Sequence, residues 1–74
     1  MNAYIEKMKE LVKDGHIDHQ EATNRIHGFK AACEGITFEE YRQKLVNLME
    51  IGYMDKSETN ANLHGFNDFS RQTV

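Results

Sequence analysis

The chain has 74 residues, carries a formal net charge of -3 and contains a single cysteine. A chain of this length forms one domain at most and buries only roughly 60% of the surface that its unfolded form exposes. One cysteine excludes an internal disulfide framework, and twelve acidic residues interleaved with nine basic ones are typical of a solvated surface rather than a phosphate-binding face.

No stretch of the sequence approaches the roughly 20 apolar residues of a membrane span. Residues 1–12 interrupt their apolar positions with charges, unlike the hydrophobic stretch of a signal peptide. We therefore expect a protein of the cytoplasm that contacts no membrane. Because the thin core has none of the disulfides or metals that usually stabilise mini-proteins, a homodimer or higher oligomer is also an expectation.

An internal repeat organises the chain, because residues 3–29 align without gaps onto residues 40–66, a shift of 37 positions. Nine of the 27 aligned pairs are identical, whereas unrelated segments would share about one or two. We predict a single helical domain over residues 1–69 and a flexible C-terminal tail over residues 70–74. The identical pairs are Tyr4/Tyr41, Lys7/Lys44, Leu11/Leu48, Gly15/Gly52, Asp18/Asp55, Glu21/Glu58, His27/His64, Gly28/Gly65 and Phe29/Phe66.

The first copy has the pattern of helix, tight turn and helix. Its apolar residues follow helical spacing, which predicts a helix near residues 2–14. Gly15 stands where a left-handed C-terminal cap residue is expected. Asp18 and Glu21 have the spacing of a capping box, which predicts that a second helix begins there and extends over residues 18–34.

The second copy repeats this pattern and is preceded by a further helix start. Capping boxes predict helices near residues 37–51 and 55–69, with a glycine cap again between them. The N-cap residues and their acidic partners are Thr37 with Glu40 and Asp55 with Glu58.

The predicted fold is all-α, with two tandem helical hairpins that form a small pseudo-twofold four-helix bundle. Short turns place neighbouring helices antiparallel, and two like hairpins can then pack about an approximate twofold axis. We expect the apolar stripes of the two copies to face one another and form the core. The core residues are Tyr4, Leu11, Ile26 and Phe29 of the first copy and Tyr41, Leu48, Leu63 and Phe66 of the second.

Each turn contains a glycine, then Ile or Met two positions later, then an aspartate and a glutamate. This pattern resembles the turn of short helical hairpins of the SHOCT type, and the likeness covers mainly Leu11–Ala22 and Leu48–Thr59. In that family the hairpin implies an interaction or oligomerisation element rather than a catalyst. The resemblance assigns no functional residue.

The segment Asp14–Glu21 also matches the second half of an EF-hand calcium loop. In the full loop register, however, Val12 of the first copy and Met49 and Ile51 of the second would fall at ligand positions. Calcium requires several converging oxygen ligands, so apolar side chains at these positions argue against a site. We interpret the segment as a capped turn and expect neither a metal nor a cofactor.

Histidine-glycine-phenylalanine triplets recur at residues 27–29 and 64–66. Paired histidines could bind a metal or sense pH, but two histidines alone make an incomplete zinc site. The structural interpretation puts histidine near a helix end, glycine at a close crossing or cap, and phenylalanine in the core. Whether the triplets also have a function stays open. Cys33 has no nucleophile signature and is expected in the core or an interface, so we expect no enzyme and no catalytic residue.

We expect a small protein-binding adaptor, regulator or inhibitor that docks a helical surface on a partner protein. No catalytic constellation is visible, and several large apolar side chains exceed what a thin core buries. Short acidic chains of this kind are often encoded by phages or mobile elements, in which case the protein would act in the host cytoplasm. A structural or assembly protein is one alternative. The other is a nucleic-acid-binding helix-turn-helix using Arg25, Lys30, Arg42 and Lys44, which the acidic balance disfavours. The candidate partner contacts are Phe38, Met49, Tyr53 and Phe69.

Overall fold

The computed structural model describes residues 2–72, which form four α-helices joined by short turns. The helices are α1 (Asn2–Lys13), α2 (His19–Cys33), α3 (Phe38–Glu50) and α4 (Lys56–Gln72). No strand occurs between residues 2 and 72, so the prediction of an all-α fold with four helices is confirmed. Over the same residues, none of these helices combines the length and the apolar character needed to cross a membrane.

The last helix is longer than the sequence predicts. A flexible tail is expected over residues 70–74, but α4 continues through Gln72, and the rest of this tail, residues 73–74, lies outside the described residues. The added turn carries Arg71, whose guanidinium lies 3.8 Å from the carboxylate of Asp68. A basic side chain in the last turn also interacts favourably with the helix dipole, and both effects favour continuation of the helix.

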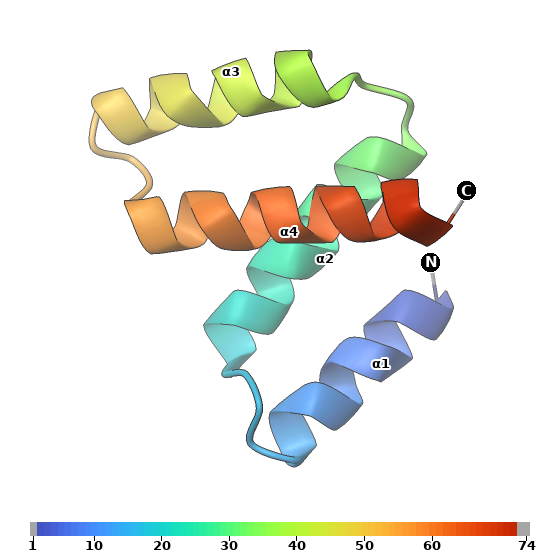
Figure 1. The fold of residues 1–74 in the computed structure, drawn as a ribbon. Coiled ribbons are helices and arrows are strands. Elements are labelled where there is room, and N and C mark those ends of the chain that lie inside the picture. Colours follow the sequence, from blue (N-terminus) through green and yellow to red (C-terminus); the bar gives the residue numbers. More distant parts are fainter. Residues whose placement is uncertain (1, 73–74) are drawn as a thin grey trace.

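The two longer helices, α2 and α4, cross at the centre of the molecule (Figure 1). Each shorter helix lies antiparallel beside the long helix of its own hairpin, α1 beside α2 and α3 beside α4. The start of α1 and the end of α4 come close to each other in this view (Figure 1). The fold is therefore two hairpins that cross through their long helices and are joined by residues 34–37.

The same backbone hydrogen bonds end the first helix of each hairpin. The N–H of Gly15 donates to the carbonyl of Val12 at 3.1 Å, and the N–H of His16 donates to that of Leu11 at 2.9 Å. The second hairpin repeats both bonds 37 residues later, around Gly52. Both glycines have φ near +80°, the left-handed conformation of a Schellman cap, which glycine adopts without a side-chain clash.

Two of the three predicted capping boxes are complete. At the start of α4, Asp55 Oδ1 accepts from the N–H of Glu58 at 2.8 Å, and Glu58 Oε1 accepts from the N–H of Asp55 at 3.2 Å. Thr37 and Glu40 form the same reciprocal pair at the start of α3. Each box satisfies two backbone donors that the helix itself leaves unpaired, and thereby determines where the helix begins.

The capping box of α2 is only half formed. Asp18 Oδ1 accepts from the N–H of Glu21 at 2.8 Å, as the sequence predicts. The carboxylate of Glu21, however, bonds to the guanidinium of Arg25 one turn further along the helix. An ion pair with a partly buried arginine therefore replaces the second capping bond at this helix start.

The apolar core is divided into two clusters, each centred on one hairpin. In the first, the ring of Tyr4 stacks on that of Phe29, with centroids 4.0 Å apart and 11° between the planes. In the second, Tyr41 stacks on Phe66 at 5.2 Å and 18°. All four rings are buried. The repeat therefore folds twice into the same aromatic stack, and the paired residues occupy like environments.

The two copies do not face one another through their apolar stripes, so this part of the prediction is wrong. Leu11 and Ile26 pack at the edge of the first cluster, and Leu63 packs at the edge of the second. Leu48 is partly buried on α3. The close approach of α2 and α4 explains the difference, because it leaves no space for large side chains between the two helices.

Glycine makes this close approach possible at two equivalent points. A Cβ atom at Gly28 would lie 1.8 Å from the carbonyl oxygen of Asn62, and one at Gly65 would lie 1.8 Å from that of Arg25. Asn62 is the repeat equivalent of Arg25, and Gly65 is that of Gly28, so the two contacts are equivalent in the two copies of the repeat. The crossing therefore has approximate twofold symmetry, and the glycine of each His-Gly-Phe triplet lies at its contact point.

Candidate functional site

The tip of the second hairpin exposes two large apolar side chains. Ile51 and Tyr53 are each 76% exposed, and they lie on either side of Gly52 in the turn between α3 and α4. The equivalent turn of the first hairpin has the same hydrogen-bonded backbone but carries Asp14 and His16 at these two positions. The turn geometry therefore does not require apolar residues here, since the other copy forms it with polar ones.

The four predicted partner contacts are found in different environments. Tyr53 is exposed, and Met49 is partly buried on α3. Phe38 packs edge-on against Phe66 with ring centroids 5.8 Å apart, and Phe69 packs edge-on against Phe29 at 5.4 Å. Phe38 and Phe69 are therefore partly buried against the core clusters, and their role as partner contacts stays a prediction. An aromatic neighbour from another helix covers each of them, which their position in the sequence does not reveal.

Ile51 is the surface residue that the sequence analysis missed. The predicted helix over residues 37–51 ends at this position, and helical periodicity does not show whether its last residue is exposed. The available signal was the comparison of the two copies, because Ile51 aligns with Asp14, an exposed polar residue. A change from polar to large apolar at a position of the same geometry is informative, because packing in the hairpin does not demand it.

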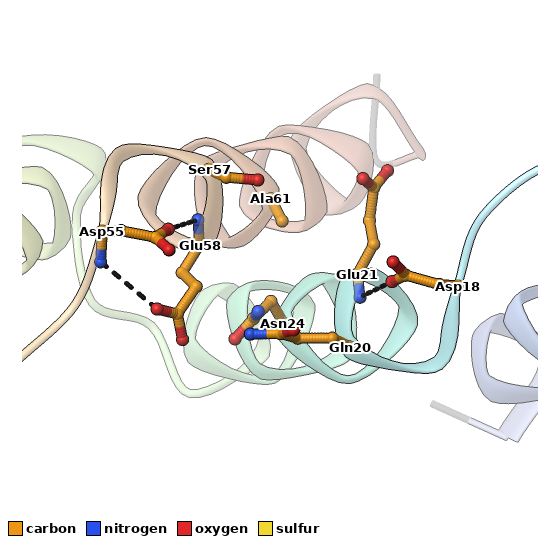
Figure 2. Close-up of a pocket in the computed structure, with 8 residues that line it drawn as sticks. All are labelled: Asp18, Gln20, Glu21, Asn24, Asp55, Ser57, Glu58 and Ala61. Carbon is orange, nitrogen blue, oxygen red and sulfur yellow. Dashed lines mark hydrogen bonds between the residues drawn. The ribbon is translucent and has the colours of Figure 1, made fainter.

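A small polar cavity of about 100 Å³ lies between the N-terminal ends of α2 and α4 (Figure 2). Its carboxylates are used for helix capping, since Asp18, Asp55 and Glu58 all bond to backbone N–H groups. Figure 2 shows the reciprocal bonds around Asp55 and the single bond at Asp18. The geometry thus assigns these acids a structural role. The lining residues are Asp18, Gln20, Glu21, Asn24, Asp55, Ser57, Glu58 and Ala61.

A buried hydrogen-bond network joins three helices next to the crossing. Asn62 of α4 accepts from the hydroxyl of Tyr41 on α3 at 2.8 Å. Its amide nitrogen donates to the side chain of Asn24 on α2 at 3.2 Å and to the carbonyl of Glu58 at 2.9 Å. Because buried polar groups are costly when unpaired, these bonds specify how the two hairpins meet.

A second polar cluster is centred on Asp68 near the ends of the chain. The hydroxyl of Tyr4 donates to Asp68 Oδ2 at 2.8 Å, and Nε2 of His64 lies 3.5 Å from the same atom. Burial, and then the hydrogen bond to Asp68, raise the pKa of Tyr4 well above its usual value. Burial also raises the pKa of Tyr41. Both phenols are therefore kept neutral in the folded chain at any ordinary pH.

The basic residues of the helix-turn-helix alternative do not form one exposed face. The side chain of Arg25 is only 16% exposed and bonds to Glu21. Lys30, Arg42 and Lys44 are exposed, and Lys30 and Lys44 line one shallow cavity together with the acidic Glu34. The interleaving of charges predicted from composition therefore also holds on the surface.

The remaining candidates for metal or thiol chemistry are dispersed. His27 and His64 are exposed, and within residues 2–72 no three His, Cys, Asp or Glu side chains are arranged to hold a metal ion. Cys33 is exposed at the end of α2, so of the two expected places, core or interface, the core is wrong and the interface stays a prediction.

Comparison with known proteins finds no family model that matches the chain, no similar curated protein and no similar solved structure. The resemblance of the turn residues to SHOCT-type hairpins stays a prediction.

Proposed function

We propose that this protein acts by binding a partner protein through the tip of its second hairpin, as a small adaptor, regulator or inhibitor. The exposure of Ile51 and Tyr53 carries the proposal. The first hairpin builds the same turn with Asp14 and His16, so folding alone gives no reason for the apolar pair. The chemistry of the tip fits an apolar pocket on the surface of another protein, into which the two side chains would insert.

The physical chemistry of the tip suits such an anchor. Burying a large apolar side chain contributes about 1.5–3 kcal/mol, and tyrosine is enriched among residues that dominate protein interfaces. The Schellman bonds fix the backbone of the turn before binding, so little backbone entropy is lost in the complex. Two large apolar side chains that flank Gly52 on a hydrogen-bonded turn can therefore provide most of the affinity of a small contact.

The test is an exchange of residues between the two turns. The double variant Ile51→Asp/Tyr53→His gives the second tip the side chains of the first and leaves the backbone bonds in place. The matched control is Asp14→Ala/His16→Ala, which changes the same two positions of the other turn. We expect a partner recovered from cells that produce the protein to bind the unsubstituted chain and the control equally. The Kd of the tip variant for this partner should be at least roughly 100-fold higher than that of the unsubstituted chain.

Two results would contradict the proposal. One is a partner that binds the tip variant as tightly as the unsubstituted chain, which would move the contact to another surface. The other is a chain that recovers no partner at all. Circular dichroism of each variant provides the folding control, because substitutions at exposed positions change stability by only about 0.5 kcal/mol.

We also propose that the protein works in the cytoplasm, and that a phage or mobile element encodes it. The single cysteine and the short acidic chain support this setting. The identity of the captured partner provides the check, since a host enzyme or regulatory protein is the expected partner of such an inhibitor.

A further inference from the structure

Each long helix completes the aromatic cluster of the other hairpin. Ala32 near the end of α2 belongs to the cluster of Tyr41 and Phe66, and Phe69 near the end of α4 packs against the cluster of Tyr4. Positions 32 and 69 are related by the same 37-residue shift as the glycine contacts. Neither hairpin closes its own core, so each presents a surface that only the other type of hairpin covers.

The connection between the hairpins makes few contacts with either of them. Within residues 34–37 only Ile36 is partly buried, and it packs on the second cluster. The hydrogen bonds of these four residues stay within the end of α2 or the start of α3. The hairpins can therefore separate by rotation at Gly35 without breaking a bond inside either hairpin.

We propose that two copies of this chain associate by exchanging hairpins, so that the surface of α2 around Gly28 in one copy packs on the surface of α4 around Gly65 in the other. In the exchanged dimer, the first hairpin of one copy packs on the second hairpin of the other through the contacts made by Gly28 and Gly65. Every contact of the closed chain is kept, and only the connecting residues change conformation. The exchanged dimer therefore contains two crossings, each formed by α2 of one copy and α4 of the other.

Concentration decides between the closed and exchanged forms. A short flexible linker holds two binding surfaces at an effective concentration on the order of millimolar. The closed monomer therefore predominates in dilute solution, and the exchanged dimer becomes populated as the chain concentration approaches that range. Two features favour the closed form, the positive φ of +91° at Gly35 and the N-cap at Thr37. Removing both should shift the balance towards the dimer.

The test uses the full chain, refolded from denaturant at near-millimolar concentration as an equal mixture of ¹³C-labelled and unlabelled copies. We expect a dimer by sedimentation equilibrium, and an isotope-filtered contact between Phe69 of one copy and Phe29 of the other. These rings touch within the closed chain, so a contact between differently labelled copies requires exchange. A chain that stays monomeric, or a dimer without this contact, would overturn the proposal.

A matched pair of variants provides a second measurement. Gly35→Ala/Thr37→Ala should dimerise at a chain concentration at least roughly tenfold below that of the unsubstituted chain, because the closed turn loses its glycine and its cap. Gly15→Ala/Asp18→Ala makes the same changes at the turn inside the first hairpin and should be less stable without dimerising more. Equal dimerisation of both variants would contradict hairpin exchange, and if the first variant fails to fold, the unsubstituted chain decides.

Discussion

Gly28 of α2 lies directly against the main-chain carbonyl of Asn62 in α4, at a separation that would leave a Cβ atom only 1.8 Å from the oxygen. The equivalent contact of Gly65 completes an approximate twofold crossing. Every other part of the fold is arranged around it, since the aromatic stacks lie on either side of the crossing and the two tips point away from it. The crossing therefore determines both the core and the exposed surface.

Replacement of either crossing glycine should destabilise the protein. Gly28→Ala would force α2 and α4 apart, and insertion of a methyl group into a filled contact costs about 1–3 kcal/mol or more. In an exposed helix the same substitution would stabilise by about 1 kcal/mol, so the sign of the change is diagnostic. Urea denaturation provides the measurement, with Lys30→Ala as a control on the exposed face of the same helix. A stabilised Gly28→Ala variant would refute the crossing.

The stability of the fold should fall at alkaline pH. The pKa of Tyr4 is raised in the folded state from its usual value of 10.0, so above that pH the unfolded chain loses a proton that the folded chain keeps. The stabilisation is fully present below about pH 10 and is lost as the pH rises above it. Above about pH 10, Tyr4→Phe should reduce the dependence of the free energy of unfolding on pH by up to about 1.4 kcal/mol per pH unit. Denaturation between neutral and strongly alkaline pH measures this, and Tyr53→Phe corrects for the loss of one phenol. An unchanged pH dependence in Tyr4→Phe would contradict the burial of the Tyr4 phenol and its hydrogen bond to Asp68.

The acidic residues of two equivalent caps should differ in importance. Glu58→Ala removes one capping bond at the start of α4 and should cost about 0.5–1 kcal/mol. Glu21→Ala removes no capping bond but leaves the guanidinium of Arg25 partly buried without its partner, which should cost about 1–3 kcal/mol. Chemical denaturation of both variants under the same conditions gives the comparison. An equal loss of stability would mean that the ion pair contributes nothing beyond a cap.

Phe69 and Tyr53 should behave in opposite ways although both are aromatic residues of the second hairpin. Phe69→Ala removes a ring that packs against Phe29 and should destabilise the fold by about 2–4 kcal/mol, since the ring is partly buried. Tyr53→Ala removes an exposed ring and should change stability by only about 0.5 kcal/mol while it weakens partner binding. Thermal denaturation distinguishes them, and a destabilised Tyr53→Ala variant would argue that the tip serves folding rather than binding.

Local features of this fold could be predicted from the sequence, because each is determined by residues close together in the chain. The glycine caps at Gly15 and Gly52 and the boxes at Thr37 and Asp55 follow from rules that need only one turn of helix. The internal repeat predicts that equivalent residues of the two copies have similar surroundings, as the ring stacks of Tyr4 and Tyr41 do. The sequence left a close crossing or a cap open for the triplet glycines, and only the long-range contact between α2 and α4 shows that both lie at a crossing.

The contacts between hairpins could not be predicted, because periodicity shows that a helix has an apolar face but not what covers it. Phe69 has the same spacing pattern as a surface anchor, and only the crossing of α2 and α4 brings it against the ring of Phe29. Glu21 matches a capping box equally well in both copies, yet the first copy has Arg25 where the second has Asn62, and the ion pair prevails.

The most direct test of the account is a NOESY spectrum of the unsubstituted chain in dilute solution. The twofold crossing predicts contacts from the α-protons of Gly28 to the backbone around Asn62, together with matching contacts from Gly65 to the backbone around Arg25. Both sets should be present with similar intensity. A spectrum in which one glycine makes these contacts and the other makes none would contradict the crossing, and with it the arrangement that leaves Ile51 and Tyr53 exposed.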